Sequence, residues 1–232
     1  MKSRIAVLAS GGGTNLQAIF DYFDARGAWA SAEVVLVASN GARAGALDRA
    51  RRRGVPAAVL ESPSDPSETL ALLERHGAEL VVLAGYLKLV PPPVTRRFRG
   101  RMVNVHPSLL PAFGGPGMYG LRVHAAVLDA GVRVSGATVH FVDEIYDRGA
   151  IVAQWPVPVF EEDTPNVLAA RVLRVEHLLL PRVVDLLASE SLALDDDGRV
   201  RGAFLAGAQG EAFVLPRAVE SLAGEIDAAL AR

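Results

Sequence analysis

Short apolar runs alternate with segments of helical periodicity through the first half of the chain, and this rhythm constrains the fold more than any other feature. The apolar runs predict strands at 5–9, 34–38, 57–60, 80–84 and 102–105, and the segments between them predict helices at 15–25, 42–53, 67–76 and 93–98. Strands that are apolar throughout are typical of a parallel sheet covered on both faces. The sequence therefore predicts an α/β fold with a doubly wound, mostly parallel sheet, whose ligand sites lie at the carboxyl ends of the strands.

The second half of the chain changes character without an evident linker or repeat. It predicts a helix at 121–129, two long strands at 134–142 and 151–159 joined by 143–149, a helix from 165 to about 187, a β-hairpin from 192–200 and 202–214, and a terminal helix. Thr164 is expected to cap the long helix, and Asp197-Gly198 to supply the hairpin turn. We expect both halves to share one sheet, so that 1–232 forms a single domain.

Composition excludes several classes of site. The chain has no cysteine, which rules out disulfides, thiolate metal ligands and a cysteine nucleophile and is compatible with a reducing cytoplasm. The formal net charge is −2, and the arginines at 49 and 51–53 are better interpreted as a solvated helix face than as a nucleic-acid patch. The start of the chain lacks the pattern of a signal peptide, and no apolar run is long enough to span a bilayer. We expect a cytoplasmic protein without nucleic-acid or membrane partners.

The segment Asn104–Pro111 places a carboxamide and an imidazole two residues apart at the end of a predicted strand. Side chains on a strand repeat with period two, so Asn104 and His106 project to the same side. Such a pair suits a carbonyl oxygen that becomes negative during reaction, because the amide can hold it and the imidazolium can give it a proton. This pattern suggests acyl-type transfer. The alternatives are that Asn104 caps the turn and that His106 is a satisfied core group.

The acidic segment 143–149 offers a partner for His106. An ionised carboxylate close to His106 would favour the imidazolium, raise its pKa from about 6.5 and hold the ring in place. Asp147 is the candidate, although it lies 41 positions downstream and an Asp-Arg-Gly turn commonly bonds its own backbone instead. We interpret His124 and His140 as packed or structural. No histidine pair has metal-ligand spacing, so no metal centre is predicted.

A glycine-rich loop, Ser10–Leu16, follows the first strand and opens the first helix. It could bind a phosphate, because glycines let the backbone approach a ligand and a helix start presents unpaired N–H groups. It could equally be a sharp turn capped by Thr14 or Asn15. The dinucleotide fingerprint fits badly, since Leu16 stands where its last glycine belongs and Ser39-Asn40 lacks an acid. A P-loop fails because no lysine is present.

Taken together, these segments resemble the phosphoribosylglycinamide formyltransferase family, whose members use 10-formyltetrahydrofolate as formyl donor. The resemblance covers about residues 5–181 in unbroken order and rests on 10–19, 82–86, 104–111, 136–142 with Asp147 beyond, and Arg171-Val172 with Glu176-His177. It implies a formyltransferase-like fold in which 1–106 forms a ribonucleotide-phosphate half and 107–190 a folate and catalytic half. The C-terminal hairpin and helix at 191–232 carry no chemistry that we can assign.

The resemblance also implies roles for individual residues. The catalytic trio would be Asn104, His106 and Asp147. The phosphate end of glycinamide ribonucleotide would bind Gly13, Thr14 and Asn15, and Glu176 would contact the same substrate. The folate pterin site would be lined by Leu87, Lys88, Leu89, Val90, Asn104, Val142, Asp143 and Tyr146.

The implied reaction is transfer of the formyl group to the glycinamide amine of 5′-phosphoribosylglycinamide in purine biosynthesis. The alternatives are a 10-formyltetrahydrofolate hydrolase, with water replacing the amine, and a non-catalytic folate- or nucleotide-binding regulator. A hydrolase built on Ser108 is disfavoured because no nucleophile-elbow motif surrounds that serine. The implied partners are small molecules, and a homodimer is left open.

Two segments depart from the family pattern. Segment 61–68 is short and rich in proline, and it lacks the arginine that many members place there beside the ligands. Loop 112–120 is longer than in the shortest members, which makes it a candidate lid over the folate cleft.

Overall fold

The computed structural model describes residues 1–202 and 219–230. The strands are β1 (Ser3–Leu8), β2 (Ala32–Ser39), β3 (Ala57–Val59), β4 (Leu80–Leu83), β5 (Met102–His106), β6 (Val134–Phe141), β7 (Ile151–Pro158), β8 (Leu192–Leu194) and β9 (Val200–Gly202). The helices are α1 (Thr14–Arg26), α2 (Gly45–Arg52), α3 (Pro66–Arg75), α4 (Pro92–Arg97), α5 (Leu121–Asp129), α6 (Pro165–Ala188) and α7 (Val219–Leu230), with a short 3-10 turn, η1 (Gly27–Trp29), after α1.

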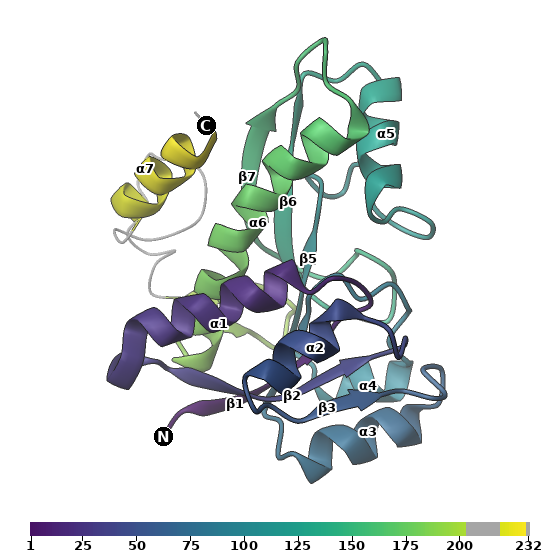
Figure 1. Cartoon of the computed structure of the whole chain (residues 1–232), viewed down its shortest axis with the longest axis vertical. Helices are drawn as coiled ribbons and strands as arrows, with labels where there is room; N and C mark the ends of the chain where they lie inside the picture. Colours follow the sequence, from purple (N-terminus) through teal and green to yellow (C-terminus); the bar gives the residue numbers. More distant parts are fainter. Residues whose placement is uncertain (203–218, 231–232) are drawn as a thin grey trace.

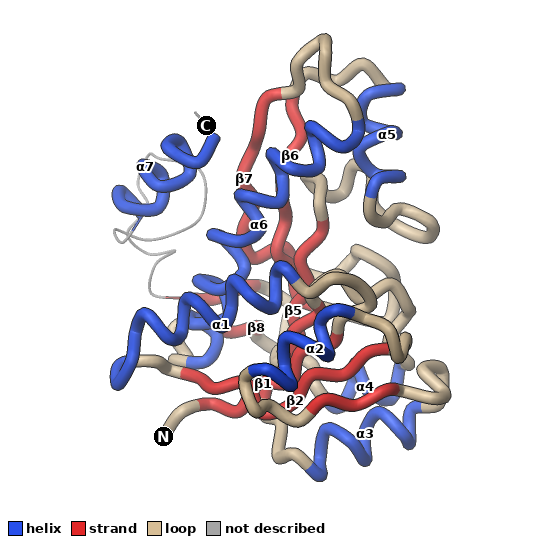
Figure 2. The backbone as a smooth tube through the Cα atoms, in the orientation of Figure 1, coloured by secondary structure: helices blue, strands red, loops and turns tan. Residues whose placement is uncertain are grey.

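A seven-stranded sheet in the order β3-β2-β1-β4-β5-β6-β7 runs through both halves of the chain. Strands β1 to β5 are parallel, whereas β6 and β7 are antiparallel to their neighbours. Side chains alternate across the sheet, so that Ile5 and Val7 of β1 pack in a different core cluster from Ala6 and Leu8. The helices α1, α2 and α6 cover one face and α3 and α4 the other (Figures 1 and 2). The predicted doubly wound, mostly parallel α/β fold is confirmed.

The predicted elements of the first half are all present, with ends that differ by at most three residues. The largest difference is at α2, which starts at Gly45 because Ala44 is still extended. There the Ala46 N–H donates to the Gly11 carbonyl at 3.1 Å, so the start of α2 packs on the glycine loop. In the second half, the cap on α6 is confirmed, since the Val167 N–H donates to Thr164 Oγ1 at 3.3 Å.

The C-terminal hairpin is present, but the predicted strands were wrong in extent. Strands β8 and β9 lie on either side of the Asp197-Gly198 turn and pair antiparallel, so the expected strand 192–200 in fact contains the turn. Gly198 has φ 77°, which the tight turn requires. The expected strand 202–214 falls outside the described residues beyond Gly202. Helix α7 confirms the predicted terminal helix and packs on α6 through the buried Ile226. In the described part of the chain, no helix is long and apolar enough to cross a membrane.

Candidate active site

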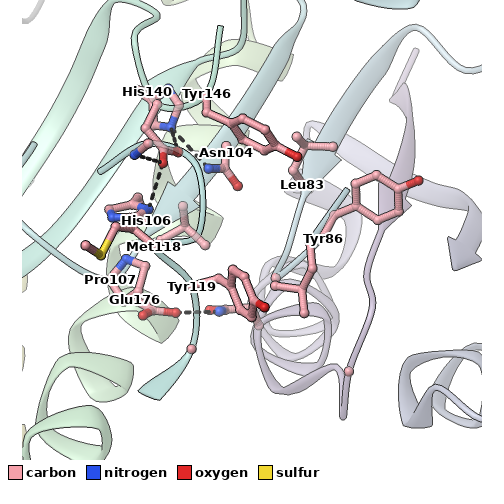
Figure 3. Close-up of a pocket in the computed structure, with 18 of the residues that line it drawn as sticks. Leu83, Tyr86, Asn104, His106, Pro107, Met118, Tyr119, His140, Tyr146 and Glu176 are labelled. Atoms are coloured by element: carbon pink, nitrogen blue, oxygen red, sulfur yellow. Dashed lines mark hydrogen bonds and ion pairs between the residues drawn. The ribbon is translucent and has the colours of Figure 1, made fainter. Parts of the chain in front are cut away.

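A cavity of about 630 Å³ opens at the carboxyl ends of β1, β4 and β5. In the sheet order, β1 lies between β2 and β4, so the chain reverses its direction of progress across the sheet at this strand. Open α/β sheets bind ligands in the crevice at such a switch point. Figure 3 shows Asn104, His106, His140 and Glu176 around this cavity.

Strand β5 presents Asn104 and His106 to the cavity wall, as their two-residue spacing predicts. His140 of β6 lies opposite Asn104 in the antiparallel register, and the Asn104 Nδ2 to His140 Nε2 distance is 3.1 Å. The His140 Nδ1–H donates to the Phe141 carbonyl at 2.7 Å, so in the neutral ring Nε2 accepts from the Asn104 amide, and only the doubly protonated ring can donate from Nε2 to Asp147. One N–H of Asn104 is therefore used by the protein and the other remains for the cavity.

Asp147 meets His106 despite the 41 positions between them. Its Oδ2 lies 3.5 Å from His106 Nδ1 and accepts the Gly115 N–H at 2.8 Å, and its Oδ1 lies 3.7 Å from His140 Nε2. The segment doubles back tightly, since Asp147 has φ 54° and a Cβ at Gly149 would overlap the Phe141 carbonyl oxygen. The structure thus favours the convergent arrangement over an aspartate turned onto its own turn.

Burial sets the proton balance of this pair, and here one expectation was wrong. The pKa of His106 lies below its usual value because burial disfavours the charged ring, and the Asp147 carboxylate and the Phe113 carbonyl offset that effect only in part. The pKa of Asp147 also lies below its usual value: burial raises it, but the His140 contact, the His106 charge and the Gly115 N–H together lower it by more. Asp147 is therefore the ionised partner, and His106 holds its proton weakly.

Both ring nitrogens of His106 have protein neighbours that accept hydrogen bonds. Nε2 lies 2.9 Å from the Phe113 carbonyl oxygen, and Nδ1 faces the Asp147 carboxylate. Two acceptors around one ring match the protonated form, in which both nitrogens donate. The hydrogen-bond acceptors around His106 thus suit the protonated ring, whereas burial disfavours its charge. A proton on this ring is therefore easily transferred.

Sequence reasoning missed the roles of two histidines in this cavity. His140, expected to be only packed, touches both Asn104 and Asp147. His124, in the first turn of α5, lines the cavity, and its Nδ1 is buried without a partner. Burial and the nearby His106 charge lower the pKa of His124 to about 4. The register of β6 against β5 would have identified His140, but the sequence does not show that register.

The other end of the cavity holds Asn15 and Glu176. The Asn15 Nδ2–H donates to Glu176 Oε2 at 2.6 Å, joining the start of α1 to α6. Burial raises the pKa of Glu176 to about 7, and the Asn15 hydrogen bond opposes that shift. The family resemblance implied that both residues contact one substrate, but no local pattern predicts a direct hydrogen bond between residues 161 positions apart.

The glycine loop reaches the cavity through Gly11 and Asn15, whereas Gly13 and Thr14 are not part of its wall. Gly13 is the N-cap of α1, with φ 73° and no side-chain cap. An added Cβ there would lie 2.7 Å from the Ala46 Cα. The close approach that demands a glycine at this position is thus made by α2.

The expected folate-lining residues all face the cavity. The wall includes Leu87, Lys88, Leu89, Val90, Asn104, Val142, Asp143 and Tyr146. Lys88 is the single lysine or arginine among the described wall residues, so no arginine replaces the one absent from segment 61–68. That segment instead folds onto Glu68, whose carboxylate accepts the Glu61 and Ser62 N–H groups at 2.9 and 2.7 Å.

Loop 112–120 contributes Gly115, Gly117, Met118, Tyr119 and Gly120 to the wall. It is tied to the catalytic cluster at two points, the Phe113 carbonyl on His106 and the Gly115 N–H on Asp147. Among the described residues, no cluster of three or more histidine and acidic side chains could hold a metal ion.

Comparisons with known proteins agree with this geometry. Residues 3–184 match the formyl transferase family. A chloroplastic phosphoribosylglycinamide formyltransferase from Arabidopsis thaliana is 43% identical over 204 residues, which cover 85% of this chain and 69% of that enzyme. The trifunctional purine biosynthetic protein adenosine-3 of Bos taurus is 40% identical over 205 residues, or 86% of this chain but 20% of that protein. The crystal structure of phosphoribosylglycinamide formyltransferase from Anaplasma phagocytophilum is 34% identical with a TM-score of 0.80, covering 94% of this chain and 100% of that one.

Proposed function

The chain belongs to the formyl transferase family, and we propose that it transfers the formyl group of 10-formyltetrahydrofolate to the glycinamide amine of 5′-phosphoribosylglycinamide. The observation that carries this proposal is the meeting of Asn104, His106 and Asp147 at the wall of one large cavity. A carboxamide, a weakly protonated imidazole and an ionised carboxylate suit acyl transfer through a tetrahedral species.

The cavity fits the formyl donor. Its volume of about 630 Å³ lies within the range of pockets that bury ligands of this size. Apolar side chains such as Leu83 and Val90 form one wall, and the backbone of 87–90 and the segment from Val142 to Tyr146 add polar groups for a pterin ring. When bound there, 10-formyltetrahydrofolate supplies the formyl carbon.

The acceptor substrate would occupy the opposite end. Its phosphate is assigned to the start of α1, where Gly13, Thr14 and Asn15 present backbone N–H groups that no side chain caps. Glu176, which is buried beside Asn15 and has one hydrogen-bond donor among the described residues, is assigned to a donor group of the same substrate. The N-terminal 1–106 would then form the ribonucleotide-phosphate half, and 107–190 the folate and catalytic half.

Asn104 and His106 would act on the formyl oxygen. As the amine attacks, this oxygen becomes anionic, and the free N–H of Asn104 and a protonated His106 can stabilise it. The Phe113 carbonyl occupies His106 Nε2 in this structure, so the oxygen can bond to that nitrogen only if it displaces this carbonyl. Loop 112–120 must therefore adjust when the substrates bind.

The proton balance assigns a role to Asp147. The acceptor amine loses one proton during the transfer, and the donor nitrogen gains one as its bond to the formyl carbon breaks. Asp147 is ionised and lies beside His106, so it can keep the ring aligned and relay a proton through a water.

The test is an assay for formylglycinamide ribonucleotide with both substrates present. The proposal predicts tetrahydrofolate release that depends on glycinamide ribonucleotide. Release at the same rate without the ribonucleotide would instead identify a hydrolase. Binding of both ligands without turnover would identify a regulator.

We further propose a cytoplasmic location, partners limited to these small molecules, and no metal. A homodimer remains compatible with the fold, and light scattering of the purified chain would measure its assembly state.

A further inference from the structure

One hydroxyl group joins the two proposed substrate sites. The Leu87 N–H donates to Ser10 Oγ at 2.9 Å, and the Ser10 hydroxyl donates to Asn40 Oδ1 at 2.5 Å. The Ser10 N–H also donates to the Gly85 carbonyl at 3.0 Å. The proposed function gives no role to the Ser39-Asn40 pair, and this contact accounts for Asn40.

Ser10 lies where three neighbouring strands end. It follows β1 and starts the glycine loop, Leu87 starts the wall segment 87–90 after β4, and Asn40 follows β2. In the sheet, β1 lies between the other two strands. The hydroxyl therefore connects the loop assigned to the acceptor phosphate with the backbone assigned to the folate.

The glycine loop beside this hydroxyl is held by α2 on one side, where Gly11 and Gly12 carbonyls accept the Ala46 N–H at 3.1 Å and the Arg49 Nε–H at 2.8 Å, and is open on the other side. Nothing lies within 4 Å of a Cβ built on Gly11 or Gly12, and Gly85 has φ 73°. Leu87 is 44% exposed, so water could satisfy its N–H if the hydroxyl were absent. Loss of the Ser10 hydroxyl would therefore leave no buried N–H unpaired at Leu87, but it would remove the side-chain hydrogen bond that holds this N–H.

We propose that Ser10 is a positioning residue that couples binding of the ribonucleotide phosphate to binding of the folate. This proposal rests on the proposed function. A phosphate bound at the glycine loop would hold Ser10 in place, and Ser10 would then hold the backbone of 87–90 in the geometry that binds folate. A ligand that orders one of two linked loops lowers the entropic cost of ordering the other. Because coupling is reciprocal, folate must tighten ribonucleotide binding by the same factor.

The experiment measures this coupling with glycinamide ribonucleotide and tetrahydrofolate, which bind without turnover. Titration calorimetry gives the Kd of tetrahydrofolate with and without saturating ribonucleotide. In the unaltered chain, the ribonucleotide should lower that Kd by about fivefold or more, the usual lower range of such coupling. Ser10→Ala should reduce the factor to below about twofold while its melting temperature stays close to that of the unaltered chain.

Ser39→Ala is the matched control. It removes a buried hydroxyl from the same edge, one that accepts the Gly41 N–H and does not touch Leu87. This variant should keep the full coupling factor, and an equal loss in it would overturn the role of Ser10.

Asn40→Ala gives a second route if Ser10→Ala does not fold. It leaves the hydroxyl in place but removes the acceptor that orients it, so the coupling should fall as well. A folded Ser10→Ala or Asn40→Ala chain with undiminished coupling would overturn the inference, as would absence of coupling in the unaltered chain. Formyl transfer measured with the unaltered chain tests the proposed function separately.

Discussion

The two ends of the cavity use carboxylates in opposite ways. Asp147 has three partners, the Gly115 N–H and two histidines, and its pKa is held below its usual value. Glu176 is more deeply buried and has one donor in the described part of the chain, Asn15, and burial raises its pKa to about 7. A carboxylate whose oxygens already have protein partners stays charged and fixed in position, which suits a catalytic role. A carboxylate with free lone pairs suits a ligand that brings its own donors.

Among the described residues, each end of the cavity also holds an unpaired polar atom, since His124 lies near His106 and Asn15 lies beside Glu176. Asn15 Oδ1, next to Glu176, and His124 Nδ1 are buried without partners in the described part of the chain. A buried polar atom without a partner costs about 1–3 kcal/mol, so its retention suggests a use. At the Asp147 end, Asn104 and His106 already have partners.

The largest effect on turnover is expected at the Asp147 end of the cavity. His106→Ala and Asn104→Ala should each lower kcat by about 10²–10³-fold, the usual loss when one donor to a developing oxyanion is removed. Their melting temperatures and the Kd of glycinamide ribonucleotide should change little. Steady-state kinetics together with thermal unfolding would check this, and near-normal turnover in either variant would refute that residue's assigned role.

Asp147→Asn should move the pH-rate profile. The Asp147 charge raises the pKa of His106, so its removal should lower that pKa further. If a protonated His106 is needed, activity is lost as pH rises through its pKa, and the variant should lose activity at lower pH. The pH dependence of kcat/KM measures this. An unchanged descending limb would remove the coupling between the two residues.

Glu176→Gln should change stability in a pH-dependent way. The folded state binds the Glu176 proton more tightly than the unfolded state, because the pKa rises from 4.5 to about 7 on burial. The contribution of the Glu176 proton to the free energy of unfolding is fully present below pH 4.5 and is lost as pH rises through 7. Between pH 4.5 and pH 8, the free energy of unfolding of Glu176→Gln should rise by on the order of 3 kcal/mol relative to that of the parent chain. Urea unfolding of both chains at the two pH values measures this difference, and equal slopes with pH would show that Glu176 is not held neutral.

Most of the fold could be predicted from the sequence because it follows from local pattern. Buried parallel strands are apolar along their whole length, and the cap at Thr164 is a local signal. The hairpin was placed wrongly because 192–200 reads as one strand unless the Asp197-Gly198 turn is given priority over the apolar residues. The turn residues were identified correctly, but the strands around them were not.

The site could be predicted only in part because its geometry is long-range. The spacing of Asn104 and His106 on one strand is local, so their common side followed from period two. Asp147 was the candidate from the acidic segment and the family resemblance supported it, because a contact across 41 positions has no local signal, and His140 depended on strand register. The direction of the His106 pKa was wrong because the sequence showed the opposing charge but not the burial, and burial has the larger effect.

The smallest expected effects come from two substitutions in the glycine loop, which distinguish its structural role from ligand binding. Gly13→Ala should destabilise the fold by about 1–3 kcal/mol, because its φ is 73° and the new Cβ would press on Ala46. Gly12→Ala meets nothing within 4 Å and should leave stability nearly unchanged, so it is the cleaner probe of a phosphate site. If the loop binds phosphate, Gly12→Ala should still raise the Kd of glycinamide ribonucleotide in calorimetry, since the added methyl group would project into open space next to the N–H groups at the start of α1. Unchanged affinity in a fully stable Gly12→Ala chain would leave the loop with only its structural role at the start of α1.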